Sequence, residues 1–320
     1  MKILVTGASG YIGSQVCKAL SQYHNIVAVD RNTVKHKYFD EYYDYDYGSF
    51  EVQKLLLTID AVVHIGATSL VGPSVLDPSK YYNNNVARTL ELLDACKAQG
   101  VKRFVFASSA ATYGEPTEDV CLESGQHEPV NPYGWSKRIT EIMLKDYAKA
   151  YGINSVSCRF FNVAGADLDE EFGQEKQATH IIARIMEQAI AGKEFTLNGN
   201  DFDTPDGTCV RDYIHVADVA KGISLAVDFT ENNAGAFVFN MGNGEGYSNM
   251  DIVNAVKEHT PLVPNIKIGP ARAGDPAKLI ADSALANNTL KWKPQYGLDT
   301  IVKTAYNWYI KTNKNKTSTS

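Results

Sequence analysis

The 320-residue sequence contains no long apolar run and no excess of basic residues. No stretch approaches the ~18 apolar residues of a membrane span, and the residues after Met1 leave no room for the apolar core of a signal peptide. The net charge of -6 offers no basic surface for nucleic acid or an anionic membrane. We therefore expect a cytoplasmic protein with no nucleic-acid or membrane partner, in which local arginines could still bind a phosphate-bearing small molecule.

Cysteine is also sparse, and no two cysteines have C-x-x-C spacing. An odd number of scattered cysteines predicts reduced thiols that serve in packing. The five are Cys17, Cys96, Cys121, Cys158 and Cys209. His64 ends an apolar segment at 61–65 without a second histidine or cysteine at metal-ligand spacing, which predicts a hydrogen-bonded structural histidine and no metal site.

The N-terminal segment has the pattern of a dinucleotide-binding turn. A short apolar run at 3–6 is followed by Gly7, Gly10 and Gly13 and then by apolar residues at helical spacing. Glycines at these positions let the backbone turn sharply and approach a pyrophosphate, whose charge is met by the N-terminus of the helix. The order of strand, glycines and helix therefore predicts a dinucleotide site.

A carboxylate at the end of the second predicted strand indicates which dinucleotide is bound. Residues 26–29 form that strand, and Asp30 follows it. A carboxylate in this place accepts hydrogen bonds from the adenosine ribose and repels a 2′-phosphate, which favours NAD over NADP. The neighbouring Arg31 leaves NADP open, because an arginine can pair with that phosphate.

Two further segments carry reactive side chains. Ser108 and Ser109 end a predicted strand at 104–107, and open parallel sheets bind their ligands at the C-terminal ends of strands. Tyr133 and Lys137 are four residues apart in a helical pattern, so their side chains share one face. A free phenol has a pKa of about 10, and a nearby cation favours its phenolate, which would make Tyr133 a base. The serines could equally cap a helix, and the Tyr-Lys spacing alone also occurs on ordinary surface helices.

The alternation of strand and helix patterns predicts the fold class. We expect an α/β protein with a Rossmann-type, doubly wound parallel sheet in residues 1–165 and a smaller C-terminal α/β substrate domain in residues 166–320. Segments at about 207–245 are expected to interleave with the first domain. The last helix is expected at about 298–310.

These motifs together resemble the extended short-chain dehydrogenase/reductase family, and within it the UDP-glucose 4-epimerases. The resemblance covers residues 1 to about 310, and its most specific stretch is TPDGTCVRDYIHV at 204–216. It implies an NAD-dependent epimerase (an isomerase) that interconverts UDP-glucose and UDP-galactose through a transient 4-keto sugar. In this reaction Tyr133 would be the base, Ser109 would contact the reacting oxygen, and Lys137 would lower the pKa of Tyr133.

The resemblance also implies which residues bind NAD and the UDP-sugar. The NAD-binding residues would be Gly7, Gly10, Tyr11, Ile12, Gly13, Asp30, Asp46, Tyr47, Asn84 and Lys137. The substrate-binding residues would be Ser109, Tyr133, Asn162, His180, Ile181, Arg211, Arg272 and Asp275. Arginine suits a diphosphate because its planar guanidinium binds two oxygens at once. Without the motif around it, Arg211 would be expected to pair with a neighbouring acid such as Asp212.

Several alternatives stay open at this stage. Ala110 and Ala111 stand where a 4,6-dehydratase of this family has an Asp-Glu pair, which argues against dehydration because alanine transfers no proton. Leu279 stands where some relatives have a bulkier tyrosine, so a UDP-N-acetylhexosamine or UDP-glucuronate 4-epimerase is possible. A non-catalytic NAD-binding regulator is the alternative from another class. The sequence also departs from the family at Arg31 and at Ser69, where a lysine is common.

Family members commonly form homodimers through two helices of each subunit. The corresponding helices are expected near residues 85–98 and 133–150.

Overall fold

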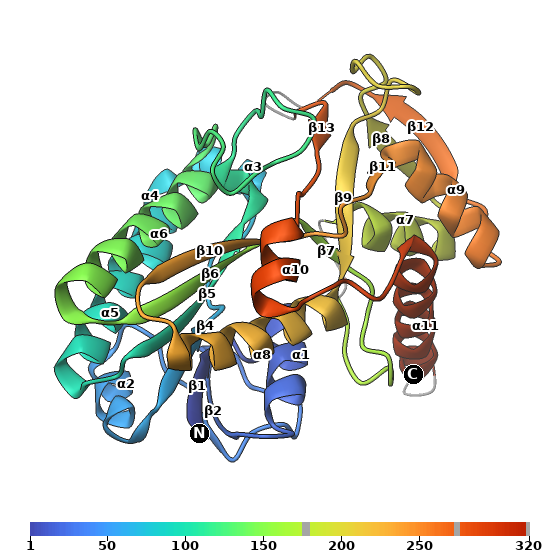
Figure 1. Ribbon diagram of the computed structural model, residues 1–320. Coiled ribbons are helices and arrows are strands. Elements are labelled where there is room, and N and C mark those ends of the chain that lie inside the picture. The colour runs from blue at the N-terminus through green and yellow to red at the C-terminus, as the bar shows by residue number, and fades with distance from the viewer. Residues whose placement is uncertain (175–179, 272–275, 318–320) are drawn as a thin grey trace.

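The computed structural model describes residues 1–174, 180–271 and 276–317, and its largest element is a seven-stranded sheet (Figure 1). The strand order is β10-β6-β5-β4-β1-β2-β3, and every neighbouring pair is parallel. The strands are β1 (Lys2–Thr6), β2 (Asn25–Val29), β3 (Glu41–Tyr43), β4 (Ala61–His64), β5 (Arg103–Ser109), β6 (Asn154–Phe160) and β10 (Ala236–Met241). The predicted Rossmann-type parallel sheet is confirmed.

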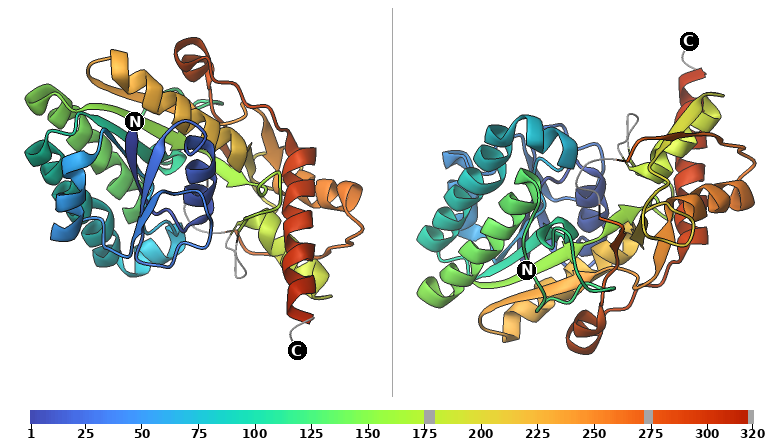
Figure 2. Two further views of the ribbon diagram at one scale, coloured as in Figure 1. Left: turned by 90° about the horizontal axis from the view of Figure 1, so that it is seen from below. Right: turned by 90° about the horizontal axis from the view of Figure 1, so that it is seen from above.

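Helices cover both faces of this sheet (Figure 2), because alternate strand residues point to opposite sides and both sets are apolar. Val5 and Ala28 belong to a core shared with α1 (Tyr11–Leu20) and α8 (Val216–Asn232). Leu4 and Val27 belong to a second core on the other face. The helices of that second core are α2 (Phe50–Leu55), α5 (Arg88–Gln99) and α6 (Pro132–Tyr151).

Short helical segments connect the longer elements of this part of the chain. They are η1 (Leu56–Thr58), α3 (Val71–Leu76), α4 (Pro78–Tyr81), η2 (Tyr82–Ala87) and η3 (Ala110–Thr112). The sequence predicts a helix near residues 85–98. In the structure this helix begins as the π-helical segment η2 and becomes α-helical only at Arg88.

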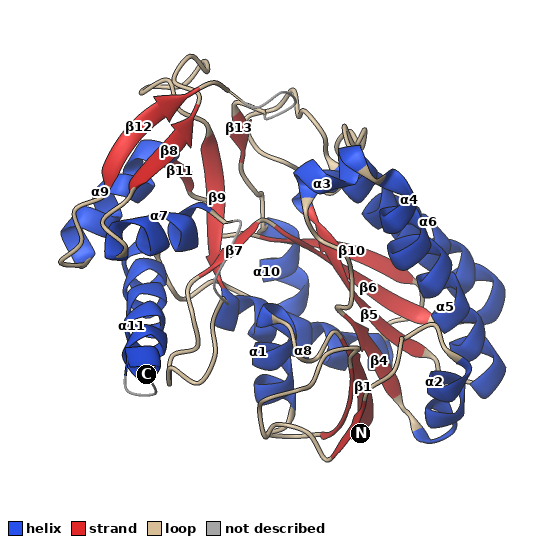
Figure 3. Ribbon diagram, turned by 180° about the vertical axis from the view of Figure 1, so that it is seen from behind, coloured by secondary structure: helices blue, strands red, loops and turns tan. Residues whose placement is uncertain are grey.

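A smaller region lies beside the large sheet, away from α5 and α6 (Figure 3). Its strands are β7 (Asn162–Ala164), β9 (Val210–His215), β11 (Gly246–Ser248) and β13 (Lys278–Leu279) in one sheet, and β8 (Glu194–Asn198) and β12 (Asn265–Gly269) in another. Its helices are α7 (Ile181–Ile190), α9 (Asn249–His259) and α11 (Leu298–Thr317). Helix α11 continues beyond the predicted end near 310, since residues 311–317 contain neither glycine nor proline.

The chain passes between the two regions more than once. After β9 in the smaller region it forms α8 and β10, which complete the large sheet, and α10 (Ala284–Leu290) also packs against β10. The division into two domains at residue 165, with 207–245 interleaved, stays a prediction. In the described part of the chain, no helix combines the length and apolarity of a membrane span.

The predicted packing role of the cysteines and the predicted hydrogen-bonded structural role of His64 are confirmed. All five cysteines are buried and free. His64 is 1% exposed, and its ring nitrogens lie 2.7 Å from Thr6 Oγ1 and 2.9 Å from Thr89 Oγ1. Burial lowers the pKa of His64 to about 3, so the ring is a neutral structural group.

The turn from β1 to α1 depends on its glycines. Gly7 has a φ of +70°, and a Cβ there would lie 2.7 Å from the backbone nitrogen of Gly66. A Cβ on Gly13 would lie 2.0 Å from the carbonyl oxygen of Gly7, whereas one on Gly10 would lie 3.3 Å from the same oxygen. The first turn of α1 is therefore packed directly onto the backbone that precedes it.

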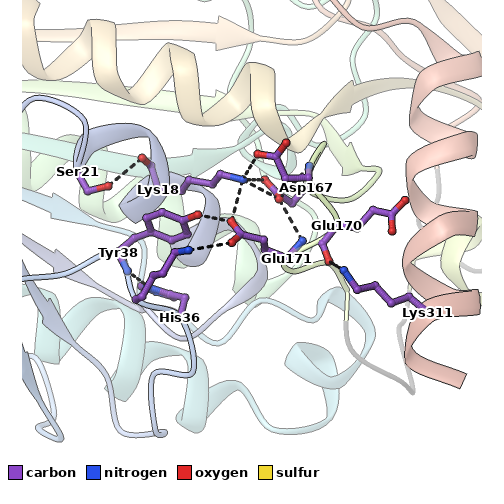
Figure 4. Close-up of polar contacts among 10 residues, drawn as sticks. Lys18, Ser21, His36, Tyr38, Asp167, Glu170, Glu171 and Lys311 are labelled. Atoms are coloured by element: carbon purple, nitrogen blue, oxygen red, sulfur yellow. Dashed lines mark hydrogen bonds and ion pairs between the residues drawn. The ribbon is translucent and has the colours of Figure 1, made fainter. Parts of the chain in front are cut away.

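An ion cluster, in which only the Asp167 side chain is fully buried, connects α1 to the loop after β7 (Figure 4). Lys18 Nζ lies 2.8 Å from Asp167 Oδ2, 2.6 Å from Asp169 Oδ2 and 3.0 Å from Glu171 Oε2. Tyr38 also donates to Glu171. Burial lowers the pKa of Lys18, but the hydrogen bonds to the three carboxylates outweigh it and raise the pKa. One ammonium thus pairs with three carboxylates from a distant part of the chain and offsets part of their charge.

We expect Gly13→Ala to lower the free energy of unfolding by about 1–3 kcal/mol, because the added methyl overlaps the Gly7 carbonyl. Gly72→Ala is the matched control, since a Cβ at Gly72 meets nothing within 4 Å. Urea unfolding followed by circular dichroism measures both. Equal midpoints for the two variants would contradict the packing described for the turn.

We expect Lys18→Met to lower the free energy of unfolding by about 2 kcal/mol, because it leaves the 1%-exposed Asp167 side chain without its cation. Lys37→Met is the control, since Lys37 is 77% exposed and 3.5 Å from Glu171. Hydrogen bonds from Tyr38 and Lys18 lower the pKa of Glu171 to about 2. The stabilisation from this contact is present above the pKa of about 4 that a glutamate has in the unfolded chain, and it is lost as the pH falls. The difference in free energy of unfolding between Lys18→Met and the wild type should therefore narrow in acid. A difference that widened in acid would count against the cluster.

Candidate active site

The N-terminus of α1 offers free hydrogen-bond donors at the glycine turn. Gly10 is the N-cap residue and has no side chain with which to cap the helix. The first backbone N–H groups of a helix have no partner within it, and together with the helix dipole they bind anions. Tyr11 follows at once and donates to the carbonyl of Gly165 at 2.8 Å. This geometry suits a pyrophosphate, as the sequence predicts.

Asp30 faces the same turn. Its Oδ2 accepts the backbone N–H of Ser9 at 3.0 Å, and its Oδ1 accepts the N–H of Asn32 at 2.9 Å. Arg31 is 59% exposed and lies 3.6 Å from a carboxylate oxygen of Asp46. The guanidinium of Arg31 thus pairs with Asp46. The charged group beside the glycine turn is the carboxylate of Asp30. This arrangement favours a ribose with a free 2′-hydroxyl.

Tyr47, another residue predicted for the cofactor, lies near this turn through Gly66. Tyr47 is buried and donates to the carbonyl of Asn84, whose own side chain donates to Asn85 Oδ1 at 3.0 Å. The Tyr47 ring also lies against Gly66, where a Cβ would come within 3.1 Å of it. Ser69 is exposed in the loop after β4. The individual contacts of Ile12, Asp46, Tyr47 and Asn84 with a cofactor stay predictions.

Ser109 and Tyr133 come together although 23 residues lie between them. Ser109 is the last residue of β5, and Tyr133 lies in the first turn of α6, whose N-cap residue Asn131 accepts the N–H of Gly134 at 2.8 Å. Both side chains are half-buried. Burial raises the pKa of Tyr133, and a hydrogen bond with Ser109 opposes this rise.

Lys137 lies one turn further along α6 and is almost fully buried. Its Nζ donates to the carbonyl of Ala107 at 2.7 Å and lies 5.9 Å from the centre of the Tyr133 ring. Burial lowers the pKa of Lys137 to about 7, while the negative charge of Glu141 raises it. In this environment burial disfavours the charged forms of both Lys137 and Tyr133, so the lowering of the tyrosine pKa by lysine stays a prediction.

Three of the residues predicted to bind substrate line one cavity. They are Asn162 at the start of β7, His180 at the N-cap of α7, and Ile181. The cavity is also lined by Tyr213 and Trp308, neither of which the sequence analysis singled out. Tyr213 follows Arg211 by two residues on β9 and therefore shares its strand face, a signal that could have identified it.

Arg211 is buried on β9, and its Nη1 donates to the carbonyl of Val210 at 2.8 Å. Asp212, the neighbouring acid considered as its partner, accepts the backbone N–H groups of Asn243 and Gly244 at 2.7 and 2.9 Å. Asp212 therefore fastens the loop after β10 to β9. The predicted substrate residues Arg272 and Asp275 lie outside the described residues.

Comparison with known proteins shows the family of the chain. The sequence profile of the NAD dependent epimerase/dehydratase family matches residues 3–242. The chain is 41% identical to UDP-glucose 4-epimerase of Lactobacillus helveticus, over 97% of each chain.

Solved structures are similar over nearly the whole chain. UDP-glucose 4-epimerase from Brucella ovis, in complex with NAD, has a TM-score of 0.90 and 39% identity and covers 96% of this chain and 97% of its own. The enzyme from Bifidobacterium longum, in complex with NAD+ and UDP, has a TM-score of 0.90 and 32% identity, with coverage of 98% and 99%. The chain therefore belongs to the NAD dependent epimerase/dehydratase family, among the UDP-glucose 4-epimerases.

Proposed function

We propose that this protein is an NAD-dependent epimerase that interconverts UDP-glucose and UDP-galactose at C4 through a transient 4-keto sugar. The observation that carries the proposal is the convergence of Ser109, Tyr133 and Lys137 at the C-terminal end of β5. The same edge of the sheet carries the glycine turn and Asp30, which fit NAD. NAD, when bound, supplies a hydride acceptor and donor beside the sugar.

The side chains of the site would transfer the proton of the sugar 4-hydroxyl and form a hydrogen bond to its oxygen. Tyr133, as phenolate, accepts the proton of the sugar 4-hydroxyl, and Ser109 donates a hydrogen bond to the oxygen that becomes the ketone. Lys137 stabilises the phenolate through its positive charge. After the sugar has turned over, Tyr133 returns the proton to the same oxygen. The proton and the hydride both leave and return, so the sugar undergoes no net oxidation.

A separate anchor would hold the nucleotide while the sugar turns. Asn162, His180 and Ile181 line one cavity in the smaller region, and Arg211 is buried on the neighbouring strand β9. A guanidinium binds phosphate oxygens tightly, and a bound UDP group would keep the 4-keto sugar in the site. On this proposal residues 1–165 form the NAD-binding domain, which also contributes Ser109, Tyr133 and Asn162 to the UDP-sugar, and residues 166–320 form the UDP-sugar-binding domain.

The dehydratase alternative is disfavoured at the catalytic end of β5. Ala110 and Ala111 follow Ser109 directly, in the short helix η3. Neither side chain can give or take a proton, and dehydration requires an acid and a base at C5 and C6. We therefore assign no elimination step to this site.

A second candidate is epimerisation of UDP-N-acetylhexosamines. Leu279 is half-buried in β13 and packs against the cluster that contains Ala110, Tyr113 and Phe161. Ala110 adjoins Ser109 and Phe161 adjoins Asn162, so Leu279 lies near both ends of the proposed sugar site. A leucine there leaves more room than a tyrosine. UDP-glucuronate is a further alternative substrate, and a non-catalytic regulator is the alternative without turnover.

We also propose a homodimer in the cytoplasm. Helices α5 and α6 pack together and expose large apolar side chains. These are Leu90, Trp135 and Ile142, each between 40% and 44% exposed. A shared apolar surface on two helices suits a subunit interface, and five buried free thiols suit a reducing compartment.

We expect Tyr133→Phe to lower kcat for conversion of UDP-galactose to UDP-glucose by about 10²–10⁴-fold, because the base is removed. Tyr147→Phe is the control on the same helix, since the Tyr147 hydroxyl bonds Asp94 at 2.7 Å and should leave kcat unchanged. The assay measures UDP-glucose formed by purified protein with bound NAD confirmed. Turnover that survives Tyr133→Phe would refute the assigned base, and no turnover of any UDP-sugar by the wild type would favour the regulator.

We expect Leu279→Tyr to lower kcat/KM for UDP-N-acetylgalactosamine relative to UDP-galactose by about tenfold, because the larger ring crowds the N-acetyl group. Leu285→Tyr is the control, since Leu285 is 44% exposed on α10. Competition between the two substrates measures the ratio. A wild type that rejects the N-acetyl sugar would remove the second candidate function.

A further inference from the structure

A row of buried polar residues crosses the large sheet beneath the proposed catalytic site. Ser108 on β5 pairs with Arg159 on β6, and Arg159 pairs with Asn240 on β10. Their exposed fractions are 3%, 1% and 0%. Strands of a parallel sheet are ordinarily apolar, and buried polar groups are costly unless they are paired. A polar row at this depth therefore requires partners on the neighbouring elements.

Glu141 on α6 supplies the main partner. Its Oε1 accepts Arg159 Nε at 2.8 Å and Ser108 Oγ at 2.7 Å. Its Oε2 accepts Arg159 Nη2 at 2.7 Å and Arg138 Nη1 at 3.1 Å. Burial raises the pKa of Glu141, but Arg159, Ser108 and Arg138 lower it below its ordinary value. The carboxylate is thus fixed in place and ionised at neutral pH.

The other end of the row holds the loop that follows β5. Arg159 Nη1 donates to the Tyr113 hydroxyl at 2.9 Å and lies 2.6 Å from His127 Nε2. Tyr113 in turn donates to Asn240 Oδ1 at 2.6 Å. Burial lowers the pKa of His127 to about 4, so this ring is neutral beside the guanidinium. Arg159 therefore has one anionic partner among these groups, which is Glu141.

Helix α6 places Glu141 in line with the proposed base. Tyr133, Lys137 and Glu141 are spaced four residues apart and share one face. They meet three consecutive residues of β5: Tyr133 meets Ser109, Lys137 donates to the Ala107 carbonyl, and Glu141 accepts from Ser108. The helix is thus fastened to the end of β5 at each of three successive turns.

Few charged groups face Lys137 besides Glu141. His64 on β4 is near enough to interact with it and is neutral, because burial lowers its pKa to about 3. The ring of Phe106 on β5 lies 4.7 Å from Lys137 Nζ. The cations Arg138 on α6 and Arg159 on β6 contact Glu141 directly. The charge of Glu141 is therefore the negative charge that opposes the cost of burying the ammonium.

We propose that Glu141 is a positioning residue for the base: fixed by Ser108 and Arg159, its carboxylate keeps the shared proton on Lys137 and off Tyr133. The inference rests on the proposed function of Tyr133. Tyr133 and Lys137 can share one proton in two ways, as phenol with neutral amine or as phenolate with ammonium. Glu141 is about 6 Å along the helix from Lys137 and about 12 Å from Tyr133. Because Glu141 is nearer to Lys137, its negative charge stabilises the ammonium of Lys137 more than it destabilises the phenolate of Tyr133. The state with phenolate and ammonium is therefore favoured over the state with phenol and neutral amine.

The test is Glu141→Gln in the NAD-loaded protein, with kcat for UDP-galactose measured from about pH 5 to 10. We expect the plateau of kcat to fall by about tenfold, because less of the pair is phenolate. The acid limb of the profile, the part in which kcat rises with pH, should move to lower pH. Without the negative charge of Glu141, Tyr133 and Lys137 together lose a proton more easily. Near-ultraviolet absorbance of tyrosinate, measured without substrate, should fall in parallel.

Two controls separate charge from packing. Glu141→Asp keeps the charge and Ser108→Ala removes only one hydrogen bond, so both should keep the wild-type acid limb whatever their kcat. A third variant, Arg138→Met, removes the 28%-exposed cation that contacts Glu141. Its acid limb should move to higher pH, opposite to the shift expected for Glu141→Gln.

The proposal is overturned if the acid limb of kcat stays at the wild-type pH in both Glu141→Gln and Arg138→Met. It is also overturned if the tyrosinate absorbance of Glu141→Gln equals that of the wild type. If Glu141→Gln does not fold, the limb of Arg138→Met decides alone. If the wild type epimerises no UDP-sugar, the proposed function fails, and the tyrosinate titration still reports on Glu141.

Discussion

The burial of the Lys137 ammonium is the constraint on which the site depends. A charge that is 3% exposed needs a hydrogen-bond acceptor and a counter-charge, and the Ala107 carbonyl and Glu141 provide them. Meeting this need presses α6 against the end of β5 so closely that a Cβ on Gly134 would lie 2.4 Å from the carbonyl oxygen of Ala111. The same docking sets Tyr133 beside Ser109. One packing arrangement therefore both satisfies the buried Lys137 side chain and brings Tyr133 to Ser109.

Much of the fold could be predicted because its signals are local. The apolar strands, the glycine turn and Asp30 are each specified within a few neighbouring residues, and the structure places the Asp30 carboxylate beside the glycine turn, where it accepts the N–H of Ser9. The nearness of Ser109 and Tyr133 could not be predicted from spacing, because a connecting segment of 23 residues permits many arrangements. There the resemblance to a known family supplied what spacing could not.

The parts that sequence reasoning missed are contacts between distant segments. Lys18 meets Asp167, 149 positions further along the chain, and Trp308 on the C-terminal helix lines the same cavity as Asn162. No local pattern distinguishes such residues from ordinary surface lysines or core aromatics. Glu141 is different, because it continues the four-residue spacing of Tyr133 and Lys137. Arg159 could not be assigned to it from sequence, because that pairing depends on the register of β5 against β6.

The position of β10 has a consequence for how the chain is made. Strand β10 lies at the edge of the large sheet beside β6, yet 75 residues separate Phe160 from Ala236. During synthesis the ribosome must complete β7, β8, β9 and α8 before this edge can be covered, and until then β6 exposes unpaired backbone groups. Pairs so far apart in sequence form slowly. A nascent chain halted before residue 236 would therefore present an open sheet edge, which makes this interval the point at which the growing protein most needs protection from aggregation.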